Sequence, residues 1–188
     1  MIRGPDEGLL EPFAGLLGQS AGATRSFEFE AGDLAIAGEA SLATPIRGTG
    51  RAVRTNRGLL VALRATAILA ETCGRCLDPA ALPLEVDLDE EVLPSIDLAT
   101  GQPLDAALER DLVRLDGHHR LDLGPLLRDA VSLAEPIAVL CRPDCPGLCP
   151  TCGARLADEP DHQHDDDELD ARLSALRGFT VDGAPETG

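Results

Sequence analysis

The sequence contains no lysine, no tryptophan and no tyrosine, and its aromatic side chains are limited to four phenylalanines. Apolar residues still make up 44% of the 188 residues, so a hydrophobic core can form, mainly from Leu, Ala, Val and Ile. Bases and sugars are commonly bound by stacking on aromatic rings. The scarcity of such rings leaves few surfaces for that kind of recognition.

Two common nucleotide-binding signatures are also missing, since the sequence has no P-loop and no G-x-G-x-x-G turn. We therefore expect neither an enzyme nor a small-molecule substrate. The first residues carry acids and proline where a secretion signal needs an apolar region. The longest apolar run, 58–70, is too short to span a bilayer and contains Arg64. A cytoplasmic protein without a membrane partner is expected.

Acidic residues dominate the charge, because 33 Asp and Glu stand against 16 arginines and give a formal net charge of −17. Such a chain repels nucleic acid at long range, so any RNA contact has to be local. The stretch 40–70 has no acid and could present arginines to nucleic-acid phosphates from one sheet face: Arg47, Arg51, Arg54, Arg57 and Arg64. Alternatively, these residues are spread over both faces and pair with acids elsewhere.

Two acidic runs, 85–91 and 158–170, suggest another kind of contact. They could attract a basic partner such as a ribosomal protein. The alternative is that they form a solvated face and a solvated tail.

Hydrophobic periodicity predicts an α+β fold whose N-terminal half, 25–100, is β-rich and antiparallel. Phe27 and Phe29 alternate with glutamates, and Leu and Val alternate with acids over 82–88, as is typical of strands. Residues 59–72 have the Ala and Leu content of a helix. A strand is favoured there because the run follows a turn signal at 56–58 and leads directly into a cysteine turn.

A helix is predicted to begin near Leu123, with Asp122 at its N-cap region, and to end before Pro136. A cysteine loop follows, and a short amphipathic helix is expected at about Leu169–Arg177. We expect one domain over 25–180, with the helix and cysteine loop in 121–180 and only a soft boundary near residue 100. Residues 1–24 are expected to be a loose arm, 94–120 loop-like and 181–188 a disordered tail.

All six cysteines fall in short-spaced sets: Cys73 and Cys76 in ETCGRCL, and Cys141, Cys145, Cys149 and Cys152 in LCRPDCPGLCPTCGARL. In a reducing compartment such sets bind metal more often than they form disulfides. In a C-x-x-C turn the two sulfurs converge, and structural zinc takes four thiolate or imidazole ligands. The spacing therefore predicts structural Zn²⁺, which would also contribute folding energy to a core poor in aromatics.

Two pairings of these cysteines are open. One site could join both C-x-x-C turns through Cys73, Cys76, Cys149 and Cys152. Alternatively, Cys141, Cys145, Cys149 and Cys152 could form a local site, leaving Cys73 and Cys76 separate or joined by His162 and His164. His162 and His164 are possible additional ligands.

Chemistry other than structural metal binding is possible for Cys73 and Cys76. Buried free thiols are one reading. A redox sensor or oxidoreductase is another, and it requires a thiolate of low pKa, which Arg75 could favour. No thioredoxin-like βαβ pattern surrounds the motif.

The motifs resemble those of the YceD family of bacterial proteins. The resemblance is carried by Thr72–Leu77, by the predicted helix from Asp122, and by Leu140–Leu156, and it extends over roughly 25–180. It implies an α+β fold with an antiparallel sheet and a role in 23S rRNA accumulation, hence in large-subunit assembly. The implied partner is 23S rRNA or a pre-large-subunit particle. An alternative function is a chaperone that binds one basic ribosomal protein without RNA contact. The chain departs from relatives in the Ala- and Leu-rich 59–70 stretch and in His-Gln-His at 162–164, where relatives can carry further cysteines.

Overall fold

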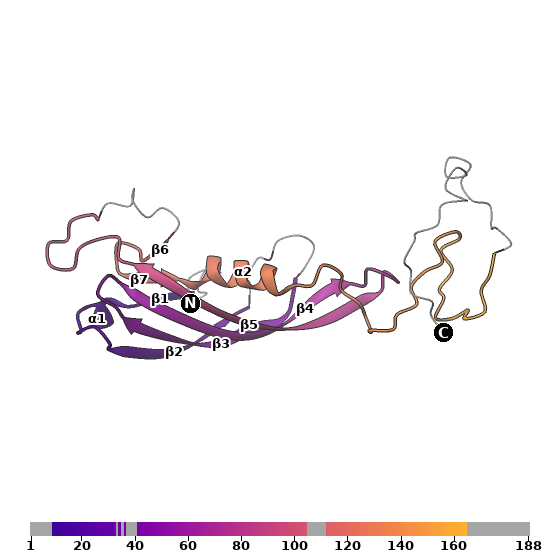
Figure 1. Cartoon of the computed structure of the whole chain (residues 1–188), viewed down its shortest axis with the longest axis horizontal. Helices are drawn as coiled ribbons and strands as arrows, with labels where there is room; N and C mark the ends of the chain where they lie inside the picture. The colour runs from indigo at the N-terminus through magenta and orange to yellow at the C-terminus, as the bar shows by residue number, and fades with distance from the viewer. Residues whose placement is uncertain (1–8, 33, 35, 37–40, 105–111, 165–188) are drawn as a thin grey trace, which may run out of the picture. The chain divides into compact units, whose positions relative to one another are not determined.

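The computed structural model describes residues 9–32, 34, 36, 41–104 and 112–164 (Figure 1). The chain divides into two compact units, Met1–Gly147 and Leu148–Gly188. The division lies inside the cysteine loop, and so differs from the expected single domain and from a soft boundary near residue 100. The named helices and strands all belong to the first unit.

A five-stranded sheet forms the body of the first unit, in the order β2-β3-β4-β5-β6. Neighbouring strands are antiparallel from β2 to β5, while the short β6 pairs with β5 in parallel. This confirms the α+β prediction with an antiparallel, β-rich first half. The strands are β2 Thr24–Ala31, β3 Ser41–Arg54, β4 Leu59–Thr72, β5 Pro79–Leu93 and β6 Val113–Arg114.

The ambiguous run 59–72 is strand β4, as predicted. Its odd-numbered residues from Leu59 to Leu69 are buried, while the even-numbered ones are exposed or half-buried. A helix would spread these residues around its circumference and could not place them all in one core. Ladder hydrogen bonds to β3 on one side and β5 on the other therefore override the helical propensity of Ala and Leu.

The first residues of the described chain are part of the fold, so the predicted loose arm is wrong over 9–24. Strand β1, Leu10–Pro12, pairs with β7, Arg120–Asp122, and helix α1, Ala14–Leu17, follows. Phe13 is fully buried and meets the Phe27 ring edge-on, with 5.6 Å between centroids. Burial of an aromatic ring outweighs the cost of ordering the segment. The apolar spacing Leu9, Phe13, Leu16 and Leu17 was the signal for it.

Helix α2, Leu123–Ala134, confirms the predicted helix and its start. The Asp122 carboxylate accepts a hydrogen bond of 2.9 Å from the N–H of Gly124, which caps the first turn. Leu123, Leu127 and Val131 share one buried face, and α2 packs against β5 (Figure 1). The predicted helix at Leu169–Arg177 and the tail lie outside the described residues. The 94–120 segment, expected to be loop, contains β6 and the start of β7.

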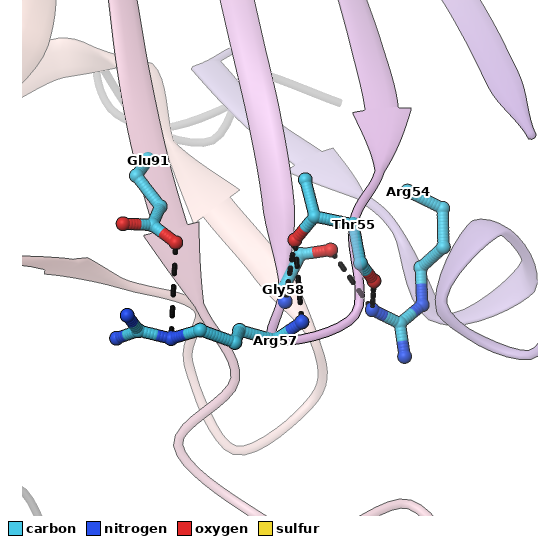
Figure 2. Close-up of polar contacts among 5 residues, drawn as sticks. All are labelled: Arg54, Thr55, Arg57, Gly58 and Glu91. Carbon is cyan, nitrogen blue, oxygen red and sulfur yellow. Dashed lines mark hydrogen bonds and ion pairs between the residues drawn. The ribbon is translucent and has the colours of Figure 1, made fainter. Parts of the chain in front are cut away.

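The hairpin turn between β3 and β4 is the one predicted at 56–58, and Figure 2 shows its contacts. The Thr55 hydroxyl oxygen accepts hydrogen bonds from the N–H groups of Arg57, at 3.3 Å, and Gly58, at 3.0 Å. Gly58 is required by space, because a Cβ there would lie 2.2 Å from the carbonyl oxygen of Val92. The turn thereby fixes the register of β3 against β4.

Two phenylalanines of β2 lie over two glycines of β3 on the core face of the sheet. The register places Phe27 opposite Gly50 and Phe29 opposite Gly48. A Cβ on Gly50 would lie 2.1 Å from the Phe27 ring. Each ring therefore fills the space that the glycine opposite leaves open, as an aromatic residue does when it covers a strand glycine.

Gly50→Ala is expected to lower the free energy of unfolding by about 1–3 kcal/mol, because Phe27 has to leave its place over the strand. Denaturant unfolding of the purified protein measures the change. Gly32→Ala is the matched control: its Cβ meets nothing within 4 Å, so its effect should stay within about 0.5 kcal/mol. Equal losses for the two variants would contradict the packing described.

Candidate metal centre

The turn between β4 and β5 positions the first cysteine pair. Cys73 follows the last residue of β4, and its N–H donates to the carbonyl of Asp78 at 2.8 Å. The N–H of Leu77 donates back to the carbonyl of Cys73 at 3.0 Å. Leu77 takes a left-handed conformation, with φ of 62°, as Gly153 does after the second C-x-x-C with φ of 76°. Both cysteines of this turn are buried.

The loop that follows α2 brings the second pair to the same place. The N–H of Gly74 donates to the carbonyl of Val139 at 2.8 Å, and the Arg75 guanidinium donates to the carbonyl of Cys145 at 2.8 Å. Cys145 is buried and Cys141 is exposed. Gly147, with φ of 82°, allows the loop to pass close to the Arg75 backbone. These hydrogen bonds hold two segments that are about 70 residues apart in the chain.

The four sulfur atoms of this first centre lie within 4.8 Å of one another: Cys73, Cys76, Cys141 and Cys145. The Sγ atoms of Cys73 and Cys145 are 3.8 Å apart, and those of Cys76 and Cys141 are 3.6 Å apart. A tetrahedral ion with bonds of about 2.3 Å to sulfur requires edges of about 3.8 Å. None of the cysteines is in a disulfide. The geometry therefore fits a single metal ion held by four thiolates.

Backbone N–H groups prepare one of these sulfurs for metal binding. The N–H groups of Cys76, Cys141 and Arg75 lower the pKa of Cys73 to about 6, since they donate to its thiolate. The N–H of Asp78 acts in the same direction on Cys76, but burial and the neighbouring thiols raise the pKa of Cys76 to about 12. Thiolates packed this closely repel one another, and a cation bound between them removes that penalty.

A second cluster forms within Leu148–Gly188 and contains both expected histidines: Cys149, Cys152, His162 and His164. Backbone N–H groups of Cys152 and Thr151 lower the pKa of Cys149 to about 6. Neither pairing considered from the sequence is the one observed. Cys73 and Cys76 join Cys141 and Cys145, whereas Cys149 and Cys152 join the two histidines.

Hydrogen bonds of the loop after α2 explain why Cys141 and Cys145 lie next to Cys73 and Cys76. Carbonyls of Val139 and Cys145 accept from the Cys73 turn, which aligns Cys141 and Cys145 with it. Sequence reasoning had assigned no structural role to the Arg75 side chain or to Gly147. Their only signals were an arginine inside the C-x-x-C and a glycine midway between two cysteines.

The five arginines proposed for rRNA do not form one surface. Arg54 is held in the fold, because its guanidinium donates to the carbonyl of Leu17 at 3.1 Å. It also donates to the carbonyls of Gly58, at 3.0 Å, and Thr55 (Figure 2). Arg57 lies in the turn, with its Nε 3.9 Å from a carboxylate oxygen of Glu91. The remaining arginines occupy exposed positions on β3 and β4: Arg47, Arg51 and Arg64.

Carboxylates flank those exposed arginines on both sides. Nη2 of Arg47 lies 3.1 Å from Oε1 of Glu30 on β2. Nε of Arg64 lies 3.3 Å from Oδ2 of Asp87 on β5. Arg51 of β3 pairs with Ser26 of β2, and on its other side Ala62 of β4 separates it from Asp89 of β5. We call this surface the outer sheet face. Its carboxylates are Glu28, Glu30, Glu85, Asp87, Asp89 and Glu91.

Fold and centre together define a β-rich α+β protein whose sheet hairpin and helix loop meet at a cysteine centre able to hold a metal ion. Residues 61–180 match the family described as "Large ribosomal RNA subunit accumulation protein YceD". The chain belongs to the YceD family, as its motifs indicated.

Similar proteins occur in mycobacteria. An uncharacterised protein of Mycobacterium bovis is 38% identical over 126 residues, covering 67% of this chain and 58% of the relative. An uncharacterised protein of Mycobacterium leprae is 32% identical over 146 residues, covering 76% of this chain and 63% of the relative. The chain thus spans less than two thirds of the length of these relatives. No solved structure matches it. Within the described residues, no helix has the length and hydrophobicity needed to cross a bilayer.

Gly147→Ala tests the close approach of the loop to the Cys73 turn. Alanine at a positive φ costs about 1 kcal/mol of unfolding free energy. A Cβ on Gly147 would also lie 3.0 Å from the Arg75 carbonyl oxygen, which should add about 1 kcal/mol more. Gly101→Ala is the control, with φ of 68° and open space around its Cβ. Denaturant unfolding compares the two, and identical losses would show that the close approach is unimportant.

Proposed function

We propose that the chain is a non-enzymatic cytoplasmic factor in ribosome biogenesis, which supports 23S rRNA accumulation and large-subunit assembly. The observation that carries this proposal is the family match over 61–180, which includes every ligand of the first centre. The family description supplies the link to ribosomal RNA. The molecular role is argued from two features of the first unit: the cysteine centre and the outer sheet face.

Zinc is the metal we assign to the first centre. Four thiolates are a soft ligand set that suits Zn²⁺, and a closed set leaves no position for a substrate. The ion would join the tip of the β4–β5 hairpin to the loop after α2. Around it the packing is thin, since the local cluster consists of the cysteines with Ala80 and Val139 and partly buried Leu82 and Leu140. Metal binding would supply stability there that side-chain packing supplies elsewhere.

A thiol redox role is the competing function, and one observation favours it. The pKa of Cys73 is lowered by backbone N–H groups while that of Cys76 is raised by burial and neighbouring thiols, as in pairs where one thiolate attacks and the other resolves. Against it, Cys73 is fully buried and lies in a hairpin turn. The same low pKa suits a metal ligand, which has to be deprotonated to bind.

The outer sheet face is the surface we assign to the assembly partner. Carboxylates of β2 and β5 enclose the exposed arginines of β3 and β4, and a hollow of about 530 Å³ lies among Ser26, Arg51, Arg64 and Asp89. Carboxylates at the rim repel phosphate and attract cations. Because carboxylates surround the arginines, the face favours a basic segment of a ribosomal protein over rRNA as its binding partner. Direct rRNA contact through the arginines is the alternative.

Substitution of Cys141 separates the metal role from the redox role. Cys141→Ser should remove the zinc of the first centre, whereas Cys141→His should retain it, because imidazole is also a zinc ligand and the position is exposed. Elemental mass spectrometry of the purified full chain measures the metal. In a strain lacking the protein, the His variant should restore 23S rRNA levels and the Ser variant should not.

A redox mechanism predicts instead that both Cys141 variants remain active. Cys73 and Cys76 would suffice without metal, so Cys141→Ser would remain active and form a reversible disulfide. That result would overturn the zinc assignment.

Charge neutralisation on the outer sheet face distinguishes its two candidate partners. The acid-neutral variant Glu28→Gln, Glu30→Gln, Asp87→Asn, Asp89→Asn should weaken association with pre-large-subunit particles. The arginine-neutral variant Arg47→Gln, Arg51→Gln, Arg64→Gln is the matched control and should not weaken it. Co-sedimentation at several salt concentrations measures both. The opposite signs, stronger binding without the acids and weaker binding without the arginines, would show that rRNA occupies the face.

A further inference from the structure

The cluster in the C-terminal unit is a second place where this chain can hold a metal. We propose that Cys149, Cys152, His162 and His164 bind one zinc ion as a mixed thiolate–imidazole site, and that this ion folds residues 148–164 independently of the first centre. The proposal concerns this unit alone and does not depend on the role in ribosome assembly.

The ligand atoms already converge. The Nε2 atoms of His162 and His164 are 2.9 Å apart, and they lie 3.1 and 3.3 Å from Sγ of Cys152. Sγ of Cys149 belongs to the same group, whose atoms all lie within 4.8 Å of one another. A tetrahedral zinc requires about 3.3 Å between two nitrogens and about 3.6 Å between nitrogen and sulfur. The atoms need to move outward by only a few tenths of an ångström to accept the ion.

The backbone of 148–156 is shaped for two converging sulfurs. The N–H of Cys149 donates to the carbonyl of Ala154, and the N–H of Gly153 donates to the carbonyl of Cys149, both at 2.8 Å. Leu148 and Arg155 form an antiparallel bridge beside them. Gly153 has φ of 76°, which a glycine adopts without strain. This short reversal places both cysteine side chains at one end.

An independent contact prepares His162 for an ion. Its Nδ1 lies 3.0 Å from a carboxylate oxygen of Glu159. A carboxylate at Nδ1 keeps the proton there and leaves the Nε2 lone pair free, as it does for metal-bound histidines in general. Nε2 is also the atom that faces Cys152 and His164. A turn in which the N–H of His162 donates to the carbonyl of Glu159 at 3.1 Å fixes the two residues relative to each other.

Side-chain packing is too sparse to stabilise the folded conformation of residues 148–164. Of the described residues 148–164, Cys149 alone is buried, and the apolar Leu148, Ala154 and Leu156 are only half-buried. A segment this short does not reach a stable fold through hydrophobic burial, and small units of this kind are usually held by metal or disulfides. With its cysteines free, metal is the available means.

The two sites differ in access to solvent. In the first, Cys141 is the exposed ligand, whereas in the second both Cys152 and His164 are exposed. Two neutral imidazoles also stabilise the ion less than two further thiolates do in competition with a thiol-seeking chelator. We therefore expect the second zinc to leave first, and the first centre to remain loaded as an internal reference.

Metal stoichiometry of the full chain tests the second site. The wild type should bind two zinc ions, and His162→Ala with His164→Ala should bind one. His162→Cys with His164→Cys should restore two, because thiolates replace the imidazoles. His118→Ala with His119→Ala is the matched control, since these histidines lie outside both clusters, and it should bind two. A wild type with one ion, or an alanine variant that keeps two, would overturn the proposal.

Cobalt substitution and proteolysis identify which site is occupied. Sulfur-to-cobalt charge-transfer absorbance should be about half as intense for the second ion as for the first, since two thiolates replace four. On addition of a chelator, cleavage within 148–164 should appear while the first cobalt ion remains bound. Equal absorbance for the two ions, or unchanged protease resistance after the second ion is lost, would contradict the assignment. Neither readout involves ribosome association, so failure of the assembly role would be recognised separately.

Discussion

The antiparallel pairing of β4 with β5 is the constraint on which the first unit depends. It runs without interruption from Leu59 opposite Val92 to Thr72 opposite Pro79. One face of this pair supplies much of the core, and β3 and β6 extend the sheet from its two sides. Its far end carries the Cys73 turn. A slip of one residue would reverse both faces and turn the cysteines away from the loop after α2, so register and metal centre are set by the same hydrogen bonds.

The chain changes its means of stabilisation along its length. Around β2–β5 and α2 it buries Leu, Val and Ile together with three phenylalanines, of which Phe27 contacts both Phe13 and Phe29. At the hairpin tip the buried side chains become cysteine, alanine and valine. In the C-terminal unit, Cys149 is the one buried residue among the described residues 148–164. Hydrophobic burial decreases in this order while the density of metal ligands increases, which is the expected exchange in a protein with few aromatic residues.

The elements that could be predicted from the sequence are those defined by a local side-chain pattern. The alternation in β2 and β5, the turn before β4 and the capped helix α2 were of this kind. Phe13 was missed because its burial depends on Phe27, a residue in another strand. The pairing of the cysteines could not be derived either, since it depends on hydrogen bonds from Gly74 and Arg75 to a loop about 65 to 70 residues away. The contacts of Arg54 were also not derivable from the sequence, because its carbonyl partners Leu17 and Gly58 become neighbours only in the folded chain.

The position of Gly147 between the two clusters has a consequence for the chain during its synthesis. Every ligand of the first centre precedes Gly147 in the sequence, and every ligand of the second cluster follows it. The set that joins hairpin and helix loop is therefore complete once Cys145 has left the ribosome, before any of the later cysteines or histidines is needed. No thiol has to move from one metal site to the other as the chain lengthens. An ion bound early by the first centre does not occupy a ligand that the second cluster needs.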